Sequence, residues 1–263
     1  MKILAVGDIV GEAGREFIYN NLFKIRKKYD IDFVIANGEN AANTNGITHD
    51  IANMLVDRGV DVITMGNHTF SNRECPAVLE SNPYIIRPLN LAGDIEGVGS
   101  IVSDTPFGKV GVINLLGRVG MSPADCPFRA VEKAIGEMDA DIIAVDMHAE
   151  ATSEKLAMGN FIDSMQDDPR PKIVFGTHTH VQTADEHIMP YGVGYISDLG
   201  MTGVMDSVLG VKKEIIIQFY YNMGKRYKFE KADGVAWFNG CVFDIDVSAK
   251  KVVGLKRLRF NKI

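Results

Sequence analysis

Five short motifs carry side chains that can bind metal ions, and each directly follows an apolar segment. The motifs are Gly7-Asp8, Gly38-Glu39-Asn40, Gly66-Asn67-His68, His148 and Gly176-Thr177-His178-Thr179-His180. In α/β sheets, ligand-binding groups gather just past the carboxyl ends of the strands. We therefore expect all five motifs to converge on one rim of a sheet. Carboxylate, amide and imidazole ligands without thiolates favour Fe, Mn or Zn over Cu(I).

Each of these residues, taken singly, also has a purely structural explanation. Asp8 fits the N-cap of a following helix, Asn40 and Asn67 fit turns, and His148 fits a hydrogen-bonded core histidine. His178 and His180, two residues apart, would share one face of an extended segment. Chance does not readily place five such groups after five consecutive strands, so the joint pattern favours a metal centre.

The chemistry that suits this set is displacement at phosphorus between two metal ions. Two divalent ions roughly 3.5–4 Å apart clamp the attacking and leaving oxygens, and a bound water becomes a nucleophile near neutral pH. One carboxylate must bridge the ions, and Glu39 is long enough to do so. His68 follows the expected ligand Asn67 and would protonate the leaving alkoxide as general acid. The alternatives for His68 are a further metal ligand or a packing group.

The elements that must position these groups follow from the hydrophobic pattern. Ile18, Leu22 and Ile25 recur at helical spacing. The first two thirds of the chain alternate strand and helix patterns, and the last third is rich in strand patterns. Expected helices are 12–29, 48–58, 127–138 and 152–164. Expected strands are 2–6, 33–36, 60–65, 110–116, 141–147, 172–175, 211–220, 235–245 and 252–260. Sheets covered by helices, packed on a second sheet, would accommodate this order within one domain spanning 1–263.

Composition excludes several classes of protein. The 263 residues carry 34 acidic against 28 basic side chains, a net charge of −6, which argues against a binder of long nucleic acid. The basic C-terminal segment 250–262 alternates with apolar residues and is typical of an edge strand. Three scattered cysteines indicate neither disulfides nor a thiolate zinc site. No segment reaches membrane-spanning length and the apolar start is too short for a signal peptide, so we expect a cytoplasmic protein that does not bind membranes.

The motif series resembles that of the calcineurin-like metallophosphoesterase superfamily, D-x-H, G-D, G-N-H-D/E, H and G-H-x-H. Three departures are similar to the YmdB-like family of bacterial cyclic-nucleotide phosphodiesterases. Val10 stands where the superfamily has its first histidine, Glu39 replaces the bridging aspartate, and Thr69 replaces the acid after His68. A threonine is inserted before His178. Longer runs around Asp8, from 148 to 155 and from 178 to 185 extend the resemblance over essentially the whole chain.

The resemblance implies a four-layer α/β/β/α sandwich and a set of ligands for two metal ions per chain. The first ion would be held by Asp8, Glu39, Asn40 and His180, with Asn40 compensating for the histidine missing at position 10. The second would be held by Glu39, Asn67, His148 and His178. The ions would be divalent or mixed-valence, Fe or Mn first and Zn as the alternative. His68 would be the proton donor, without its usual acidic partner because of Thr69.

The activity implied by the resemblance is hydrolysis of a small phosphoester, with 2′,3′-cyclic nucleotides first and 3′,5′-cyclic nucleotides second. Two alternatives remain open on the residues alone. The same centre would serve a phosphomonoesterase, such as a nucleotidase or phosphatase, because charge clamping is indifferent to the leaving group. A metal-dependent regulatory protein would also keep the ligands, although an intact His68 argues against it. Homo-oligomerisation remains open as well.

Overall fold

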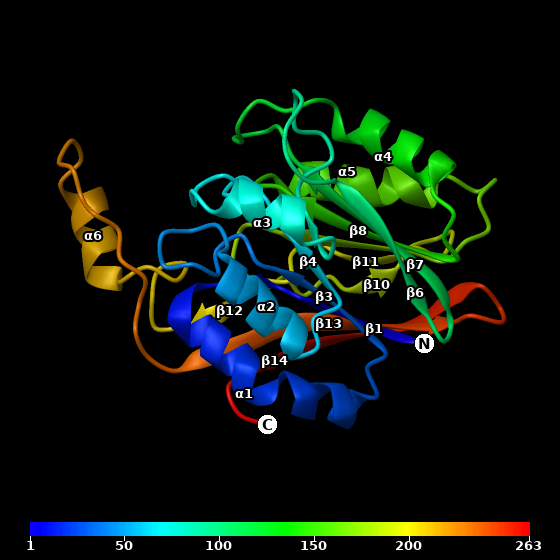
Figure 1. Ribbon diagram of the computed structural model, residues 1–263, viewed down its shortest axis with the longest axis horizontal. Helices are drawn as coiled ribbons and strands as arrows, with labels where there is room; N and C mark the ends of the chain where they lie inside the picture. Colours follow the sequence, from blue (N-terminus) through cyan, green and yellow to red (C-terminus); the bar gives the residue numbers. More distant parts are fainter.

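Two β-sheets packed face to face form the centre of the computed structural model, which describes residues 1–263 (Figure 1). Helices α1, α2 and α3 cover the outer face of the first sheet, and α4 and α5 cover the outer face of the second. The order of layers is therefore helix, sheet, sheet, helix, which confirms the predicted α/β/β/α sandwich. The helices are α1 (Gly11–Tyr29), α2 (His49–Asp57), α3 (Cys75–Ser81), α4 (Pro127–Glu137), α5 (Thr152–Asp163) and α6 (Lys213–Tyr221).

The first sheet has eight strands, in the order β2-β12-β13-β1-β3-β4-β5, with β14 paired to β13. Strands β1, β3, β4 and β5 run parallel to one another, whereas β13 is antiparallel to both β1 and β14. The bounds are β1 (Lys2–Val6), β2 (Asp8–Ile9), β3 (Phe33–Asn37), β4 (Val62–Thr64), β5 (Ile85–Ile86), β12 (Met201–Val204), β13 (Ala236–Asp246) and β14 (Lys251–Phe260).

The second sheet has six strands, in the order β10-β11-β9-β8-β7-β6. Its four middle strands are parallel, and β6 and β10 are antiparallel strands at its two edges. The bounds are β6 (Ser100–Thr105), β7 (Gly108–Leu116), β8 (Ile142–His148), β9 (Lys172–Thr177), β10 (His187–Ile188) and β11 (Gly194–Ile196).

Strand alternation explains how one chain builds three apolar layers. Successive side chains of a strand point to opposite faces of the sheet. In β1, Leu4 and Val6 therefore pack under α1, while Ile3 and Ala5 enter the core between the two sheets. The side chains of strand β8 alternate in the same way, with Ile142 facing the other sheet and Ile143 facing α4 and α5. Burial on both faces accounts for the nearly continuous apolar runs read in the sequence.

The predicted strand over 211–220 is wrong. Residues 213–221 form helix α6, which stands apart from both sheets, at the left of Figure 1, and has no buried residue. The segment Ile215-Ile216-Ile217 with its following aromatic residues has high strand propensity, but that propensity reflects packing against a pleated neighbour. No sheet edge is available here, so the backbone satisfies its hydrogen bonds locally as a helix.

The other long elements agree with the sequence prediction to within a few residues. The basic C-terminal segment is β14, paired to β13, with Val252 and Leu258 buried and most of its charged residues exposed. Sequence patterning missed α3 and the short strands β2, β5, β10, β11 and β12, as well as β6. None of the helices has the length and apolar composition needed to cross a bilayer.

Candidate metal centre

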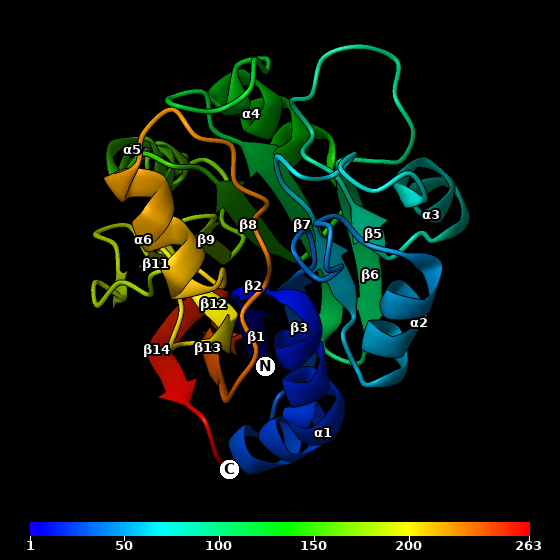
Figure 2. The ribbon, with the colours of Figure 1, turned by 90° about the vertical axis from the view of Figure 1, so that its left-hand side faces the viewer.

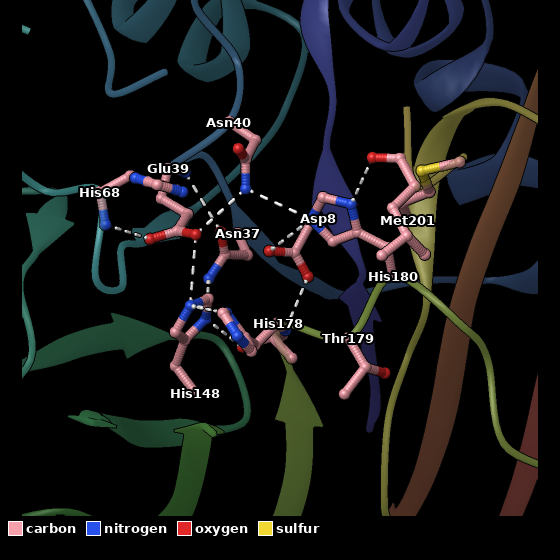
Figure 3. Close-up of polar contacts among 12 residues, drawn as sticks. Asp8, Asn37, Glu39, Asn40, His68, His148, His178, Thr179, His180 and Met201 are labelled. Carbon is pink, nitrogen blue, oxygen red and sulfur yellow. Dashed lines mark hydrogen bonds and ion pairs between the residues drawn. The ribbon is translucent and has the colours of Figure 1, made fainter. Parts of the chain in front are cut away.

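All eight site residues expected from the sequence meet at one place, where the carboxyl ends of strands from both sheets lie together. Figure 3 labels all of them except Asn67. The first sheet supplies Asp8 after β1, the pair Glu39 and Asn40 after β3, and the pair Asn67 and His68 after β4. The second sheet supplies His148 at the end of β8, and His178 and His180 after β9. Parallel strands put these ends at the same rim, which is why residues 170 positions apart become neighbours.

Glu39 lies at the centre of the cluster and is fully buried. Its Oε1 lies 3.2 Å from His148 Nε2 and accepts a hydrogen bond from the Asn40 amide at 3.0 Å. Its Oε2 accepts the backbone N–H of His68 at 2.7 Å. The Glu39 carboxylate therefore contacts residues carried by both sheets, Asn40 and His68 from the first and His148 from the second.

A first group of ligand atoms surrounds His148. The Nε2 atom of His148 lies 2.9 Å from Asn67 Oδ1 and 3.1 Å from His178 Nδ1. The ligand atoms of Glu39, His148 and His178 all lie within 4.8 Å of one another, close enough to hold one metal ion.

A second group surrounds Asp8, which is also fully buried. Its Oδ2 accepts the backbone N–H of His178 at 3.1 Å. Its Oδ1 has no hydrogen-bond donor and lies 3.7 Å from His180 Nε2. A buried carboxylate oxygen without a partner is costly, and a cation at this position would satisfy it. The donor set and this orphaned oxygen together fit a metal ion.

The side chain of Asn40 turns its amide nitrogen, not its oxygen, toward the centre. Its Nδ2 lies 3.0 Å from Glu39 Oε1 and 3.3 Å from His180 Nε2. Its Oδ1 faces the Nζ of Lys231 at 3.4 Å. Because metals bind the amide oxygen, ligation by Asn40 requires a half-turn of its side-chain amide.

The carboxylates and imidazoles of the site stabilise one another's charged forms. Burial would raise the pKa of Asp8 and Glu39, but the imidazoles of His180 and His148 outweigh burial and lower both values. Burial alone would lower the pKa of His148, but Glu39 first and Asp8 next raise it to about 9. The metal-free site thus pairs two buried carboxylates with a protonated imidazole, and a metal ion would take the place of that proton.

A buried chain of hydrogen bonds fixes the ring of His148 from behind. Its Nδ1 lies 2.9 Å from the Thr177 hydroxyl, which donates to Asp146 Oδ1 at 2.6 Å. The other oxygen of Asp146 accepts the hydroxyl of Thr64 at 2.5 Å. Burial raises the pKa of Asp146 to about 6. Partners of this kind orient a ligating histidine so that its other nitrogen faces the metal.

A buried ion pair supports the loop that carries His178 and His180. Both histidines have left-handed backbone conformations, with φ of 100° and 63°, which L-residues adopt at a cost. Between them, Thr179 donates its backbone N–H at 3.2 Å and its hydroxyl at 2.8 Å to Asp198 Oδ2. The same oxygen accepts Lys155 Nζ at 2.6 Å. Asp198 and Lys155 thereby hold the loop in its unusual conformation.

His68 is half-buried and lies beside Glu39, and one of its two ring nitrogens has a hydrogen-bond partner. Its Nδ1 lies 3.3 Å from Ser71 Oγ, which leaves Nε2 free. Thr69 is buried and turns away, donating its hydroxyl to the carbonyl of Gly66 at 2.6 Å. Ser71 therefore takes the orienting place that Thr69 does not fill. Burial lowers the pKa of His68, although Glu39 opposes this effect.

Several residues around the site escaped the sequence analysis. Asp146, Lys155, Asp198, Ser71 and Lys231 lie far from the motifs in sequence or carry no distinctive spacing. Thr177 was visible only as an insertion in the last motif. The two histidines outside the motifs, at positions 49 and 187, are exposed.

Comparison with known proteins identifies the family. A family model described as YmdB-like protein matches residues 4–258. The chain belongs to the YmdB-like family. Within this family, the 2′,3′-cyclic-nucleotide 2′-phosphodiesterase of Bacillus subtilis is 42% identical, over 99% of this chain and 97% of that protein. The resemblance stated from the motifs is thereby confirmed.

Solved structures agree with this assignment. A structure described as a novel phosphatase from Mycoplasma pneumoniae has a TM-score of 0.91 and 37% identity, covering 99% of this chain and 93% of that one. A putative 5′-nucleotidase from Staphylococcus aureus has a TM-score of 0.58 at 15% identity, over 99% of this chain and 54% of that one, and shares the fold alone. The relatives of this YmdB-like chain are named as phosphodiesterases and phosphatases, so it is a member of a family of phosphoester hydrolases.

Proposed function

We propose that this protein hydrolyses 2′,3′-cyclic nucleotides at a centre of two divalent metal ions. The observation that carries the proposal is the convergence of seven potential ligands, with buried Glu39 at their centre and His68 beside them. The activity named for the Bacillus subtilis relative supports the choice of substrate. Attack at phosphorus with cleavage of the P–O2′ bond would leave a 3′-phosphomonoester.

The ligands divide into two sets that share Glu39. Asp8, Asn40 and His180 would complete the site for the first ion. Asn67, His148 and His178 would complete the site for the second. When bound, two such ions supply Lewis acidity at the phosphoryl oxygens and a nucleophile at neutral pH. Imidazole with carboxylate and amide oxygen suits Fe, Mn or Zn, and the family resemblance puts Fe or Mn first, with Zn as the alternative.

His68 would donate the proton that the leaving oxygen needs. An alkoxide is a strong base, and a positioned acid speeds its departure. The Nδ1 contact with Ser71 and the backbone contact with Glu39 fix the ring, so that Nε2 remains available. The lowered pKa of His68 makes its protonated form a stronger acid.

A substrate panel with metal-analysed protein tests the proposal. It compares 2′,3′-cyclic AMP, 3′,5′-cyclic AMP and the 3′- and 5′-monophosphates. We expect a preference for the 2′,3′-cyclic ester, and we expect His68→Ala to lower kcat by about 10²–10⁴-fold without loss of metal. His187→Ala, which changes an exposed histidine outside the site, is the matched control. A preference for monophosphates, or full activity of His68→Ala, would contradict the proposal.

A further inference from the structure

A two-stranded ribbon carries the chain out to α6 and back to the rim of the metal centre. We call it the cap ribbon, residues 208–212 and 229–232. Val211 and Lys231 form an antiparallel bridge. The backbone N–H of Lys212 donates to the carbonyl of Glu230 at 3.0 Å, and that of Ala232 donates to the carbonyl of Gly210 at 2.8 Å. The ribbon joins α6 to the body of the molecule, as the second view shows (Figure 2).

The cap ribbon contacts two of the expected metal ligands. The carbonyl of Leu209 lies 3.0 Å from Nδ1 of His180, and Lys231 Nζ lies 3.4 Å from Asn40 Oδ1. The His180 contact does not involve the Asn40 oxygen that must turn to the metal, so it holds the ribbon at hydrogen-bond distance from the centre, on the side of Asp8. A group presented by the ribbon has a defined position relative to a phosphate held at the metals.

The cavity over the centre has a volume of about 530 Å³, and most of the residues that line it have polar side chains. Fifteen residues line it, and only three of them are hydrophobic. These three are Leu209, Val211 and Phe229, all from the cap ribbon. The only lysine in the lining, Lys231, also comes from the ribbon. One segment thus supplies all three hydrophobic residues and the one lysine of the cavity lining.

Phe229 and Lys231 are placed so that they can contact two parts of one ligand, its base and its phosphate. Both residues line the cavity. Two positions of extended chain span about 6.6 Å, which is comparable with the span from phosphate to base in a cyclic nucleotide. Phe229 is 52% exposed. Phe219 of α6 forms a T-shaped pair with its ring, with centroids 5.5 Å apart and planes at 85°. This contact covers at most one of the two faces of the Phe229 ring.

We propose that the cap ribbon is the nucleoside-recognition site of this enzyme, in which Phe229 stacks on the base and Lys231 binds the phosphate. This inference rests on the proposed function and adds what the metal centre lacks, a surface that distinguishes a nucleotide from any other cyclic phosphate. Stacking accepts every base because each base has a π-face. We therefore expect little discrimination between adenine and uracil.

The test compares two substrates that share the reacting ring. They are 2′,3′-cyclic AMP and methyl β-riboside 2′,3′-cyclic phosphate, which has no base. We expect Phe229→Ala to lower kcat/KM for the nucleotide by about tenfold or more and to leave the base-free substrate unchanged. Phe229→Trp should retain nucleotide activity, and Phe229→Leu should lie between. Tyr221→Ala, an exposed aromatic change in α6 outside the cavity, is the matched control.

Lys231→Met provides a separate arm, because it removes the charge and keeps most of the side-chain volume. It should lower kcat/KM for both substrates. Equal losses on the two substrates in Phe229→Ala, or no loss, would overturn base stacking. Unchanged kinetics in Lys231→Met would overturn phosphate binding.

Equilibrium binding separates this inference from the proposed reaction. Titration calorimetry of the metal-loaded protein would measure Kd for adenosine 3′-phosphate and for ribose 3′-phosphate. Tighter binding of the nucleotide that disappears in Phe229→Ala supports the site even where no cyclic ester is hydrolysed. If the protein hydrolyses cyclic nucleotides but Phe229→Ala leaves Kd for adenosine 3′-phosphate unchanged, the nucleoside site is contradicted and the proposed reaction is not.

Discussion

Replacement of Lys155 by methionine tests whether a buried ion pair holds the loop of His178 and His180. The side chains of Lys155 and Asp198 are each 2% exposed, and their charged atoms lie 2.6 Å apart. Lys155→Met keeps the volume and leaves the Asp198 carboxylate buried without its counter-charge. Removing one partner of a buried pair costs about 3–5 kcal/mol. Three backbone and hydroxyl donors, from Thr179 and Gly200, still reach Asp198, so we expect the lower part of this range, about 3–4 kcal/mol.

The assay is urea unfolding of the metal-free protein, followed by circular dichroism. A matched control is Lys109→Met, because Lys109 and Asp139 are also 2.6 Å apart but lie in solvent. Exposed ion pairs contribute little, so this variant should unfold almost as the wild type does. The double variant Lys155→Met/Asp198→Asn should cost less than the sum of the two single changes, because no unpaired charge remains.

Burial, not distance, decides the expected difference between the two lysines. Equal effects of Lys155→Met and Lys109→Met would refute the reasoning, as would a loss below about 1 kcal/mol for Lys155→Met. Metal titration of the same variants connects stability to the site. We expect weaker metal binding in Lys155→Met alone, because its loop carries two of the ligands.

Three further predictions concern the centre itself. Thr177→Val removes the hydroxyl behind His148 and should raise the metal dissociation constant about 10–100-fold in competition with a chelator; an unchanged constant would contradict the orienting role. Gly66→Ala places a Cβ against His148 and Glu39 and should abolish metal content, whereas Gly136→Ala, with open space around it, should not. Because the pKa of His148 is raised to about 9 in the metal-free site and a ligating imidazole must be neutral, metal affinity should fall as pH drops below 9. Calorimetry in buffers of different ionisation heat should detect the released proton, and binding without proton release would oppose this assignment.

The sequence predicted which motif residues converge better than it predicted the residues that surround them. Ligand types at strand ends are visible because a parallel sheet brings those ends together whatever lies between them. The long strands and helices follow from periodicity, and Ile3 and Leu4 face opposite layers as alternation requires. Family resemblance added the second sheet's place in the sandwich.

What could not be predicted depends on contacts between segments distant in sequence. Lys155 meets Asp198 across 43 positions and Lys231 meets Asn40 across 191, and no local pattern marks either pair. The sequence predicts a strand over 211–220 because β-branched and aromatic residues favour strands, but no sheet edge lies beside this segment, which forms α6. The pairing of 210–212 with 230–232 joins segments on either side of α6, and no local sequence pattern marks it.

The most direct test of the central claim is anomalous diffraction from crystals soaked in Mn²⁺. Two metal ions bridged by one carboxylate should give two peaks about 3.5–4 Å apart, on either side of Glu39. Asp8, Asn40 and His180 should surround one peak, and Asn67, His148 and His178 the other. A single peak, or peaks that do not contact Glu39, would contradict the account.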